Sequence, residues 1–385
     1  MSNSQSLSDS FLLDPSITFL NHGSFGATPI PVFDAYQRIQ RELEHEPVEF
    51  LGRKASGLLQ QSREALAKYL SVDRDDIVYI PNATQGINIV AHSLDLHSGD
   101  EVLITDHEYG AMDRTWEFLS EKKGFTYHSA EITLPLSSVE QIIDDIFSRV
   151  TPRTRVIYLS HITSPTALTF PVKEIGYKAR EMNILTVIDG AHAPGQIDLD
   201  LDSLGADFYT GNCHKWLCAP KGSAFLYARK EVQNLIHPLA VSWGWHAEIP
   251  GPSQFIDYLE WTGTRDISPY LAVPAAIEFQ TTHDWQAVCA RCHELAAWIN
   301  QELSEVFHSE SLSTSSDWFA QMVSIPLPTQ PSPETLQQRL FNDYRIEVPI
   351  VPWKGKTLVR VSVQAYNTSG DLQKLISALK SILVG

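Results

Sequence analysis

The alternation of strand and helix patterns between residues 74 and 229 is the feature that most constrains the fold of this chain. Short apolar segments in this region are separated by amphipathic stretches with helical periodicity, over residues 110–124, 138–150 and 172–183. Such alternation predicts a mainly parallel sheet with helices on both faces. Segments that are apolar on both faces, such as RVIYLS, suit buried central strands. The expected strands are 101–105, 155–160, 184–189, 206–211 and 223–228.

The pattern changes at about residue 285. A long helix is expected over residues 285–307, followed by short strands and a final helix over 371–383. A chain of 385 residues is long enough for roughly two or three domains. We therefore predict a disordered tail (1–10), an arm with helices that pack on the small domain (11–72), a large α/β domain (73–280) and a small α+β domain (281–385).

Charge and cysteine content exclude several classes of protein. The net charge of −17 argues against binding to nucleic acid and to anionic lipid, because both need a basic surface. The polar start MSNSQSLSDS lacks the apolar core of a signal peptide, and no apolar run is long enough to span a membrane. Cys289 and Cys292 are spaced C-x-x-C, but the other two cysteines form no second pair at zinc-site spacing, so no metal is expected. No association with a membrane is expected either. We expect a cytoplasmic protein.

Asp189 and Lys215 are the first candidates for chemistry. Asp189 ends an expected strand in ILTVIDGAHAPG, where a carboxylate is costly to bury without a cationic partner. A protonated pyridine nitrogen is one such partner, and a turn-forming aspartate is the alternative. Lys215 lies in the loop CHKWLCAPKG, where a lowered pKa would make the amine a nucleophile and base. The alternative is a surface lysine, and we expect Lys221 of the same loop to be solvated.

Two further segments offer groups that bind anions. In IPNATQGINIV a strand ends at Pro81, and Asn82 is a candidate N-cap for a helix whose first backbone N–H groups suit a phosphate. Most capped helices bind nothing, so this signal is weak by itself. Arg360 lies inside the expected strand LVRVSV and therefore needs a partner. A substrate carboxylate held by both arms of the guanidinium and a structural salt bridge are the two alternatives.

Together and in this order, these features resemble the class V aminotransferases of fold type I. This pyridoxal-phosphate-dependent family includes cysteine desulfurases, C–S lyases and isopenicillin-N epimerases. The resemblance runs from FLNHGSFGATP to RVSVQAYNT, and NHGSFG, EPVEFLGRK, TDHEYGAMDRTW, SHITSPTAL and IEVPIVPW place the chain nearest the isopenicillin-N-epimerase-like branch. It implies an α/β large domain with a mainly parallel seven-stranded sheet and a smaller α+β C-terminal domain. It also implies pyridoxal 5'-phosphate as cofactor and a homodimer with the cofactor site at its interface.

The resemblance also implies a role for each matching residue. Lys215 forms the internal aldimine with the cofactor, Asp189 pairs with the pyridine nitrogen, and His192 contacts the phenolic oxygen. Arg360 binds the substrate carboxylate. Further substrate-binding candidates stand in the first glycine-rich segment: Asn21, His22 and Gly23. The phosphate is held by residues of the same chain: Ala83, Thr84, Gln85, Asn212 and His214. Gly263 and Thr264 of the neighbouring subunit complete the phosphate site.

Two positions depart from the family pattern. Where the family stacks a histidine on the cofactor ring, TDHEYGA has Tyr109, which we expect to stack with His107 beside it. Core packing is the alternative for Tyr109. Where the desulfurase branch has an asparagine that reaches the cofactor oxygen, SHITSPTAL has Ser164. Ser164 is therefore kept as a cofactor-contact candidate whose contact differs from that of the family.

The cysteines bear on the reaction type. Desulfurases need a mobile thiol in the C-terminal third, and residues 342–361 contain none. Cys289 and Cys292 fall in an expected helix, and Cys213 and Cys218 flank the lysine. A desulfurase that forms a persulfide on its own cysteine is thus disfavoured.

Three reactions share the first steps of this chemistry. Lys215 yields to the substrate amine, the Cα proton leaves, and the ring stores the electrons. Reprotonation on the opposite face gives epimerisation, loss of a β-substituent gives lysis, and protonation at the cofactor carbon gives transamination. We expect an isopenicillin-N-epimerase-like enzyme acting on an amino acid or a peptide-like amino acid. Lysis of the C–S bond of cysteine or its conjugates and transamination are the alternatives, and a non-catalytic cofactor-binding scaffold is a weaker one.

Overall fold

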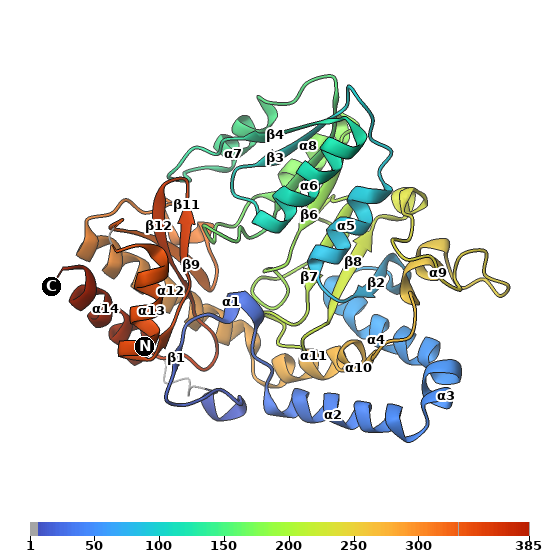
Figure 1. Cartoon of the computed structure of the whole chain (residues 1–385), viewed down its shortest axis with the longest axis horizontal. Helices are drawn as coiled ribbons and strands as arrows, with labels where there is room; N and C mark the ends of the chain where they lie inside the picture. The colour runs from blue at the N-terminus through green and yellow to red at the C-terminus, as the bar shows by residue number, and fades with distance from the viewer. Residues whose placement is uncertain (1–6, 330, 385) are drawn as a thin grey trace.

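The large domain is built on one sheet of seven strands. In the computed structural model, which describes residues 7–329 and 331–384, they are β2 (Ile77–Ile80), β3 (Glu101–Thr105), β4 (Thr126–Ala130), β5 (Thr154–Ser160), β6 (Leu185–Asp189), β7 (Phe208–Asn212) and β8 (Ala224–Ala228). Their order is β2-β8-β7-β6-β5-β3-β4 (Figure 1). Every neighbouring pair is parallel except the two that include β8. The predicted mainly parallel seven-stranded sheet is confirmed.

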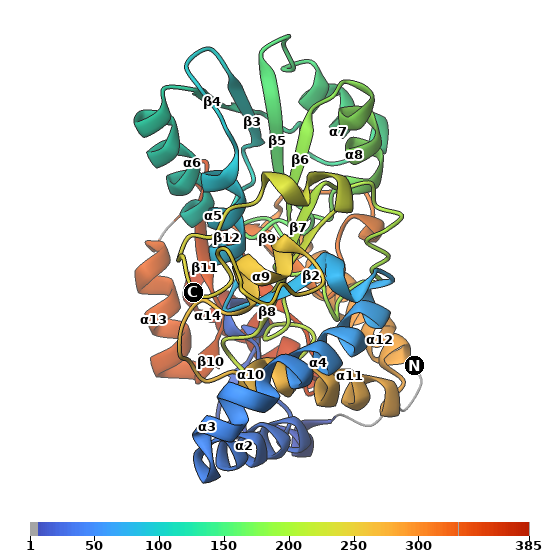
Figure 2. The ribbon, with the colours of Figure 1, turned by 90° about the vertical axis from the view of Figure 1, so that its right-hand side faces the viewer.

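Helices cover both faces of this sheet. They are α4 (Ala55–Leu70), α5 (Ala83–Ser93), α6 (Gly110–Lys123), α7 (Val139–Phe147), α8 (Val172–Glu181) and α9 (Gln254–Glu260). Because successive side chains of a strand point to opposite faces, β5 places Ile157 in one apolar core and Val156 in the other. Helices α4, α7 and α8 contribute to the first core, and α5, α6 and α9 to the second. Figure 2 shows α6 on one side of the sheet and α7 and α8 on the other.

The small domain has its own sheet and core. Its elements are α12 (Trp285–Phe307), β9 (Met322–Leu327), α13 (Pro333–Tyr344), β10 (Ile346–Glu347), β11 (Ile350–Trp353), β12 (Lys356–Ser362) and α14 (Ser369–Leu383). The antiparallel order β11-β12-β9 buries one face against α12, α13 and α14. A capping box between Thr368 and Asp371 starts α14. This smaller α+β unit agrees with the fold class predicted from the sequence.

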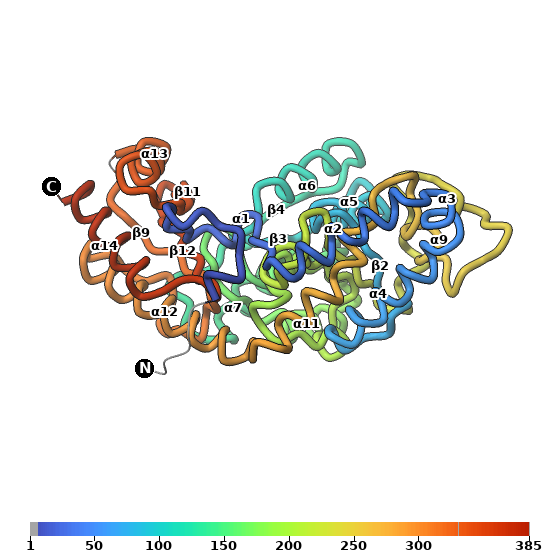
Figure 3. Tube along the Cα trace, turned by 90° about the horizontal axis from the view of Figure 1, so that it is seen from below, coloured from blue at the N-terminus to red at the C-terminus, as the bar shows by residue number. Residues whose placement is uncertain are grey.

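The N-terminal part of the chain bridges the two domains. Its elements are β1 (Thr18–Phe19), α1 (His22–Phe25), α2 (Ile30–His45) and α3 (Pro47–Glu49), and later helices α10 (Ser268–Leu271) and α11 (Val273–Thr282) lie beside them. Strand β1 pairs with β10 of the small domain. Figure 3 shows the chain passing from there across α2 toward α3 at the far end.

The structure corrects part of the predicted organisation. Helices α2 and α4 pack against α10 and α11 rather than on the small domain, because their apolar faces belong to the same core as the large sheet. Helix α11 also runs across the predicted boundary at residues 280/281. Of the predicted disordered tail, residues 1–6 lie outside the described residues. Residues Ser8–Ser10 form a 3-10 helix, and the Leu7 backbone N–H donates to the Ala365 carbonyl, so this part is packed rather than disordered.

Short helical turns complete the described chain. They are the 3-10 helices η1 (Ser8–Ser10), η3 (Arg74–Asp76), η4 (Lys230–Leu235) and η5 (Ser316–Trp318), and the π-helical turn η2 (Phe50–Lys54). None of the helices in the described ranges combines the length and the apolar character needed to cross a membrane.

Candidate active site

A cavity of about 620 Å³ lies at the carboxyl ends of the parallel strands, where open α/β sheets bind ligands. Strands β5, β6 and β7 each end at its wall, β11 and β12 line it from the small domain, and α1 closes another side. All the predicted site residues line this cavity except five: Asn21, His22, Gln85, Gly263 and Thr264. The sequence motifs therefore converge on one place in the fold.

Lys215 lies in the loop between β7 and β8. This connection is a loop rather than a crossover helix because β8 runs antiparallel to β7. The Lys215 Nζ atom is 3.3 Å from His192 Nε2. Burial and, to a smaller extent, the charge of Arg360 lower the pKa of the Lys215 amine to about 7, against the opposing charge of Asp189. Near neutral pH a large share of Lys215 is therefore the free amine, which is the form that acts as nucleophile and base.

Lys221 of the same loop has a different environment. It is exposed, as predicted, and its Nζ donates to the Gly26 carbonyl at 3.0 Å. This contact ties α1 to the lysine loop. Gly26 has φ +70°, and a Cβ atom there would lie 2.0 Å from the His214 carbonyl oxygen, so only glycine allows this close approach.

Asp189 ends β6 and presents a buried carboxylate to the cavity. Its Oδ1 accepts the Ala191 N–H at 2.9 Å and its Oδ2 accepts the Tyr158 hydroxyl at 3.3 Å. Burial raises the pKa of this carboxyl, and the Ala191 N–H, the charge of Lys215 and the Tyr158 hydroxyl only partly offset the shift. The bond to Ala191 shows that Asp189 does form a turn contact, but neither of its two hydrogen-bond donors is a cation. A cationic nitrogen there would complete the site.

Glu108 is a site residue that the sequence analysis missed. It lines the same cavity, where its Oε1 accepts the Thr105 hydroxyl at 2.5 Å and its Oε2 accepts the Ser160 hydroxyl at 2.6 Å. Burial raises the pKa of Glu108 to about 8, so the carboxyl is mostly protonated at neutral pH. The available signal was its place three residues after a strand end, next to the noted Tyr109.

The N-terminus of α5 offers an anion site, although a narrower one than predicted. The Asn82 side chain accepts the Gln85 N–H, and the Asn212 side chain accepts the Ala83 N–H, both at 2.9 Å. The predicted N-cap is thus confirmed, but its bond and that of Asn212 occupy two of the three first N–H groups. Thr84, which lines the cavity, is the residue of this turn left to meet a phosphate.

His214 stands at the same end of the cavity. Its Nδ1 donates to the Ser223 carbonyl at 2.9 Å, which leaves Nε2 for another partner. Burial lowers the pKa of His214 to about 4. A bound phosphate would favour the protonated ring and raise that pKa, since an anion stabilises a nearby cation.

Arg360 is a buried guanidinium with no carboxylate partner among the described side chains. Its Nη1 donates to the Ser164 carbonyl at 2.7 Å and to the Ser164 hydroxyl at 3.1 Å, and its Nη2 donates to the Ser24 hydroxyl at 3.2 Å. Its Nε is buried without a hydrogen-bond partner. Residues 7–329 and 331–384 therefore contain no salt-bridge partner for Arg360, and the structural salt-bridge alternative is wrong for this part of the chain. The carboxylate of a bound substrate would satisfy the guanidinium. Ser164 lines the cavity, but the contact that it makes here is with Arg360.

Tyr109 lies at the mouth of the cavity. It precedes α6, is 48% exposed, and interacts electrostatically with Arg360. Its exposure rules out the core-packing alternative, whereas stacking on the cofactor ring stays a prediction. His107 is buried beside Trp353 and donates to or accepts from Thr166 at 2.7 Å, so it supports this wall from behind.

The first glycine-rich segment reaches the site less directly than predicted. His22 is fully buried with its Nε2–H on the Lys215 carbonyl at 3.0 Å and its Nδ1 accepting from Tyr366 at 2.9 Å. Both ring nitrogens are therefore occupied by the protein, and His22 is not placed to bind substrate. Asn21 accepts from Ser24 at 2.5 Å and so acts on Arg360 through that hydroxyl. Gly23 alone of the three lines the cavity.

Gly263 and Thr264 lie outside the cavity, between α9 and α10. Thr264 is exposed. A role for both residues in the site of a neighbouring subunit stays a prediction.

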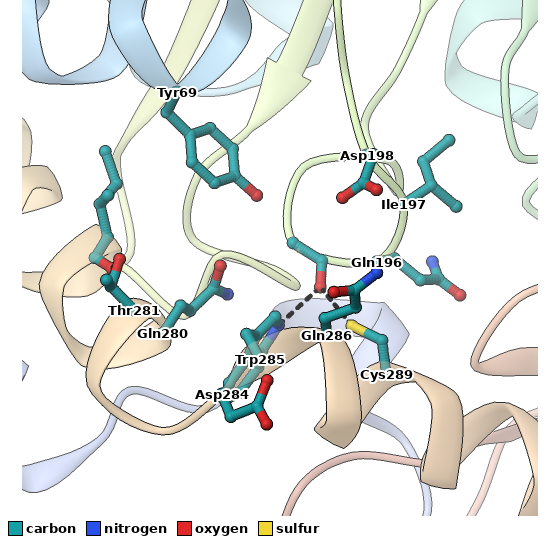
Figure 4. A pocket seen from close by; sticks show the side chains of 12 residues that line it. Tyr69, Gln196, Ile197, Asp198, Gln280, Thr281, Asp284, Trp285, Gln286 and Cys289 are labelled. Carbon is teal, nitrogen blue, oxygen red and sulfur yellow. Dashed lines mark hydrogen bonds between the residues drawn. The ribbon is translucent and has the colours of Figure 1, made fainter.

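A second cavity of about 510 Å³ lies behind the loop that follows Asp189 (Figure 4). Within it the Gly195 carbonyl accepts from Trp285 Nε1 at 2.9 Å and from Cys289 Sγ at 3.6 Å. The predicted site residues do not line it. Its relevance is structural, because Gly195 and His192 belong to the same loop after β6.

The residues of the first cavity fit pyridoxal 5'-phosphate on their own chemistry. Lys215 supplies a free amine to carry the carbonyl carbon, and Asp189 supplies a buried carboxylate that forms no ion pair with a described residue, for the ring nitrogen. Thr84 and His214 supply donors for the phosphate at a helix N-terminus. Arg360 then offers the unpaired Nε group to a substrate carboxylate.

Comparison with known proteins gives the same assignment. A family model described as Aminotransferase class-V matches residues 27–375. Isopenicillin N epimerase of Amycolatopsis lactamdurans is 35% identical over 383 residues, which cover 96% of each chain. Putative L-cysteine desulfhydrase 1 of Oryza sativa subsp. japonica is 29% identical over 96% of this chain and 84% of that protein. The solved cystine C–S lyase C-DES, in complex with cysteine persulfide, superposes with a TM-score of 0.84 at 25% identity, covering 96% of this chain and 98% of the other.

The family match covers nearly the whole chain, and both of the family's hallmarks, the lysine loop and the strand-end aspartate, meet in one cavity. This chain therefore belongs to the class V aminotransferases and is a pyridoxal-phosphate-dependent enzyme of fold type I.

Proposed function

We propose that this protein inverts the configuration at Cα of an amino acid or a peptide-like amino acid. The observation that carries the proposal is the convergence of Lys215, Asp189 and Arg360 on one cavity. These residues supply a base, a partner for the cofactor ring and a clamp for the substrate carboxylate. The full-length similarity to a protein named isopenicillin N epimerase selects epimerisation among the reactions that such a site supports.

Each residue has a defined task in this reaction. Bound pyridoxal phosphate supplies an electron sink that acidifies the Cα–H bond of the substrate. Arg360 holds the α-carboxylate with its free Nε and fixes which face of Cα points at Lys215. Lys215 Nζ, as the free amine, takes or returns the Cα proton on its own face. Asp189 keeps a positive charge at the ring nitrogen. Inversion then requires that the proton returns on the opposite face.

The cysteines support the exclusion of a persulfide-forming desulfurase. Cys213 and Cys218 are buried and do not line the cavity. Cys289 and Cys292 lie in α12, and burial raises the pKa of both thiols to about 12. Among the described residues, therefore, no cysteine thiol lines the cavity, where it could accept sulfur from a substrate bound beside Lys215.

Cleavage of a C–S bond is the second candidate. It is favoured by the structural likeness to a cystine C–S lyase, and it uses the same Lys215, Asp189 and Arg360. The two reactions diverge only after the Cα proton has left, when a lyase expels the β-substituent and an epimerase returns a proton.

One incubation separates these functions. The enzyme with its cofactor is mixed with a panel of L- and D-amino acids and short peptides bearing a free α-amino acid terminus, in D2O. Deuterium at Cα together with the opposite configuration is expected for the proposed epimerase. Pyruvate, ammonia and a sulfur product from cysteine or cystine would instead identify a lyase. A keto acid formed with pyridoxamine phosphate would identify a transaminase.

We also propose that the active unit is a homodimer in which Thr264 completes the neighbouring site. An exposed apolar segment supports an interface, since Trp243 is 86% and Ile249 is 91% exposed. Thr264 lies outside the cavity of its own chain.

Complementation tests this arrangement. Lys215→Ala and Thr264→Asp are each expected to be nearly inactive, because the first lacks the base and the second places a carboxylate against the cofactor phosphate. In a random 1:1 mixture of the subunits of a two-fold dimer, about one quarter of all sites would be intact. Activity near that level is the expected result. A mixture no more active than the sum of its parts, or an active monomer in sedimentation, would contradict the proposal.

A further inference from the structure

The residue after the catalytic lysine, Trp216, reaches the lysine amine through a histidine. Its side chain is fully buried. Its indole Nε1 donates to His192 Nδ1 at 3.2 Å, and the other nitrogen of His192, Nε2, lies 3.3 Å from Lys215 Nζ. The three side chains therefore form a chain of hydrogen bonds that ends on the reacting nitrogen.

The chemistry of indole decides where the proton of His192 resides. An indole N–H can only donate, so His192 Nδ1 has to accept. A neutral imidazole carries one proton, which must then be on Nε2. Burial, followed by the charges of Lys215 and Arg360, holds the pKa of His192 well below its usual value, so the ring is neutral. The Nε2–H then faces Lys215 Nζ, which can accept a hydrogen bond only as the free amine.

We propose that Trp216 is a positioning residue that fixes His192 as an Nε2–H donor toward the nitrogen of Lys215. The inference deepens the proposed function and rests on it in one respect, since it concerns the base of that reaction. A donor at this place stabilises the free amine and disfavours the ammonium form. Without the indole N–H, His192 could shift its proton to Nδ1 and accept from a protonated Lys215.

Trp216 is held in place from several sides. Its carbonyl accepts from Gln280 Nε2 at 3.0 Å, and the His22 ring packs against the indole with centroids 5.0 Å apart. At Gly195, with φ +87°, a Cβ atom would lie 2.2 Å from the Trp216 carbonyl oxygen, so the His192 turn can lie directly on the Trp216 backbone. Figure 4 shows Gln280 at the edge of the second cavity. These contacts fix the geometry of the hydrogen bond from Trp216 Nε1 to His192 Nδ1.

The ionisable groups around these three side chains also affect the equilibrium between the free amine and the ammonium form of Lys215. Those that face Lys215 or His192 come from four segments: Asp189, Arg360, His22 and His214. The charge of Arg360 acts on Lys215 in the same direction as the His192 donor, and Asp189 opposes it. Trp216→Phe replaces none of these four groups and removes the indole N–H that His192 Nδ1 accepts, so the tautomer of His192 is the property that this variant is expected to change.

The test reads the tautomer by NMR of the full-length chain labelled with ¹⁵N-histidine, with the cofactor bound and after its removal. His192→Gln identifies the His192 signals. The expected wild-type result is a protonated Nε2 and an unprotonated Nδ1. In Trp216→Phe we expect a smaller fraction of His192 to carry its proton on Nε2. The pH midpoint for capture of pyridoxal phosphate by the cofactor-free chain is expected to rise by about one unit.

Trp285→Phe is the matched control. It removes another buried indole, whose Nε1 donates to the Gly195 carbonyl and not to His192. The control should keep both the wild-type tautomer and the wild-type pH midpoint. A wild-type His192 that is protonated at Nδ1 would overturn the inference, even if Trp216→Phe failed to fold. So would a folded Trp216→Phe variant with an unchanged tautomer and midpoint. Because the tautomer is read without substrate, these outcomes are independent of which reaction the enzyme catalyses.

Discussion

Replacing Lys215 with alanine is expected to lower turnover by about 10³- to 10⁴-fold or more, because the change removes both the covalent anchor of the cofactor and the base. Borohydride reduction of the wild-type enzyme followed by peptide mapping should place the pyridoxyl label on Lys215. In Lys215→Ala the label should be absent from this loop. Turnover is measured with whichever amino acid the panel identifies.

Lys221→Ala is the control for this experiment. Lys221 lies six residues further along the same loop but contacts the Gly26 carbonyl rather than the cavity. Its alanine variant should keep the label on Lys215 and most of the turnover. A label on Lys221 in the wild-type enzyme would overturn the assignment of the catalytic lysine.

Arg360→Lys is expected to reduce kcat/KM by roughly 30- to 1000-fold, which corresponds to about 2–4 kcal/mol of transition-state stabilisation. Lysine keeps the positive charge but lacks the forked guanidinium and its buried Nε group, which has no hydrogen-bond partner in the described protein. The bound cofactor and the unfolding temperature should change little, because Arg360 forms no ion pair with a described carboxylate. Steady-state kinetics, cofactor absorbance and thermal unfolding together check this result.

The surface residue Arg339 provides the matched control. It pairs with Asp343 one turn along α13, so Arg339→Lys makes the same chemical change far from the cavity. That variant should keep wild-type kinetics. If Arg360→Lys instead lowered the unfolding temperature and spared the kinetics of the folded enzyme, Arg360 would be a structural residue and not a substrate clamp.

Elements with a strong periodic pattern were predictable from the sequence alone. The long helix was expected over the residues that α12 spans, Trp285–Phe307, and the strand over residues 101–105 coincides with β3. Strand β4 was missed because it lies at the edge of the sheet, where its residues are largely exposed and TYHSA carries no apolar run. The packing of α2 and α4 was predicted wrongly, because an amphipathic pattern shows that a helix buries one face but not which partner covers it.

The same distinction applies to the site. Asp189 and Lys215 were found because each stands in a motif at the end of a strand, and strand ends converge in a parallel sheet. His22 was misplaced because residue type and spacing do not show which way a ring points, and both of its nitrogens bind the protein. Glu108 was missed because one buried carboxylate among 46 acidic residues has no signal until its partners Thr105 and Ser160 are placed beside it.

The contact between His22 and Tyr366 has a consequence for biosynthesis. These residues are 344 positions apart in the sequence, and His22 also holds the carbonyl of Lys215. At a translation rate of about 5–20 residues per second, roughly 20–70 s separate the synthesis of the two side chains. During that interval the large sheet can already form on the ribosome. The lysine loop, however, still lacks a His22 ring that is fixed by Tyr366 and can bind the Lys215 carbonyl. The nascent enzyme should therefore acquire a fully formed lysine loop only after its last residues have left the ribosome.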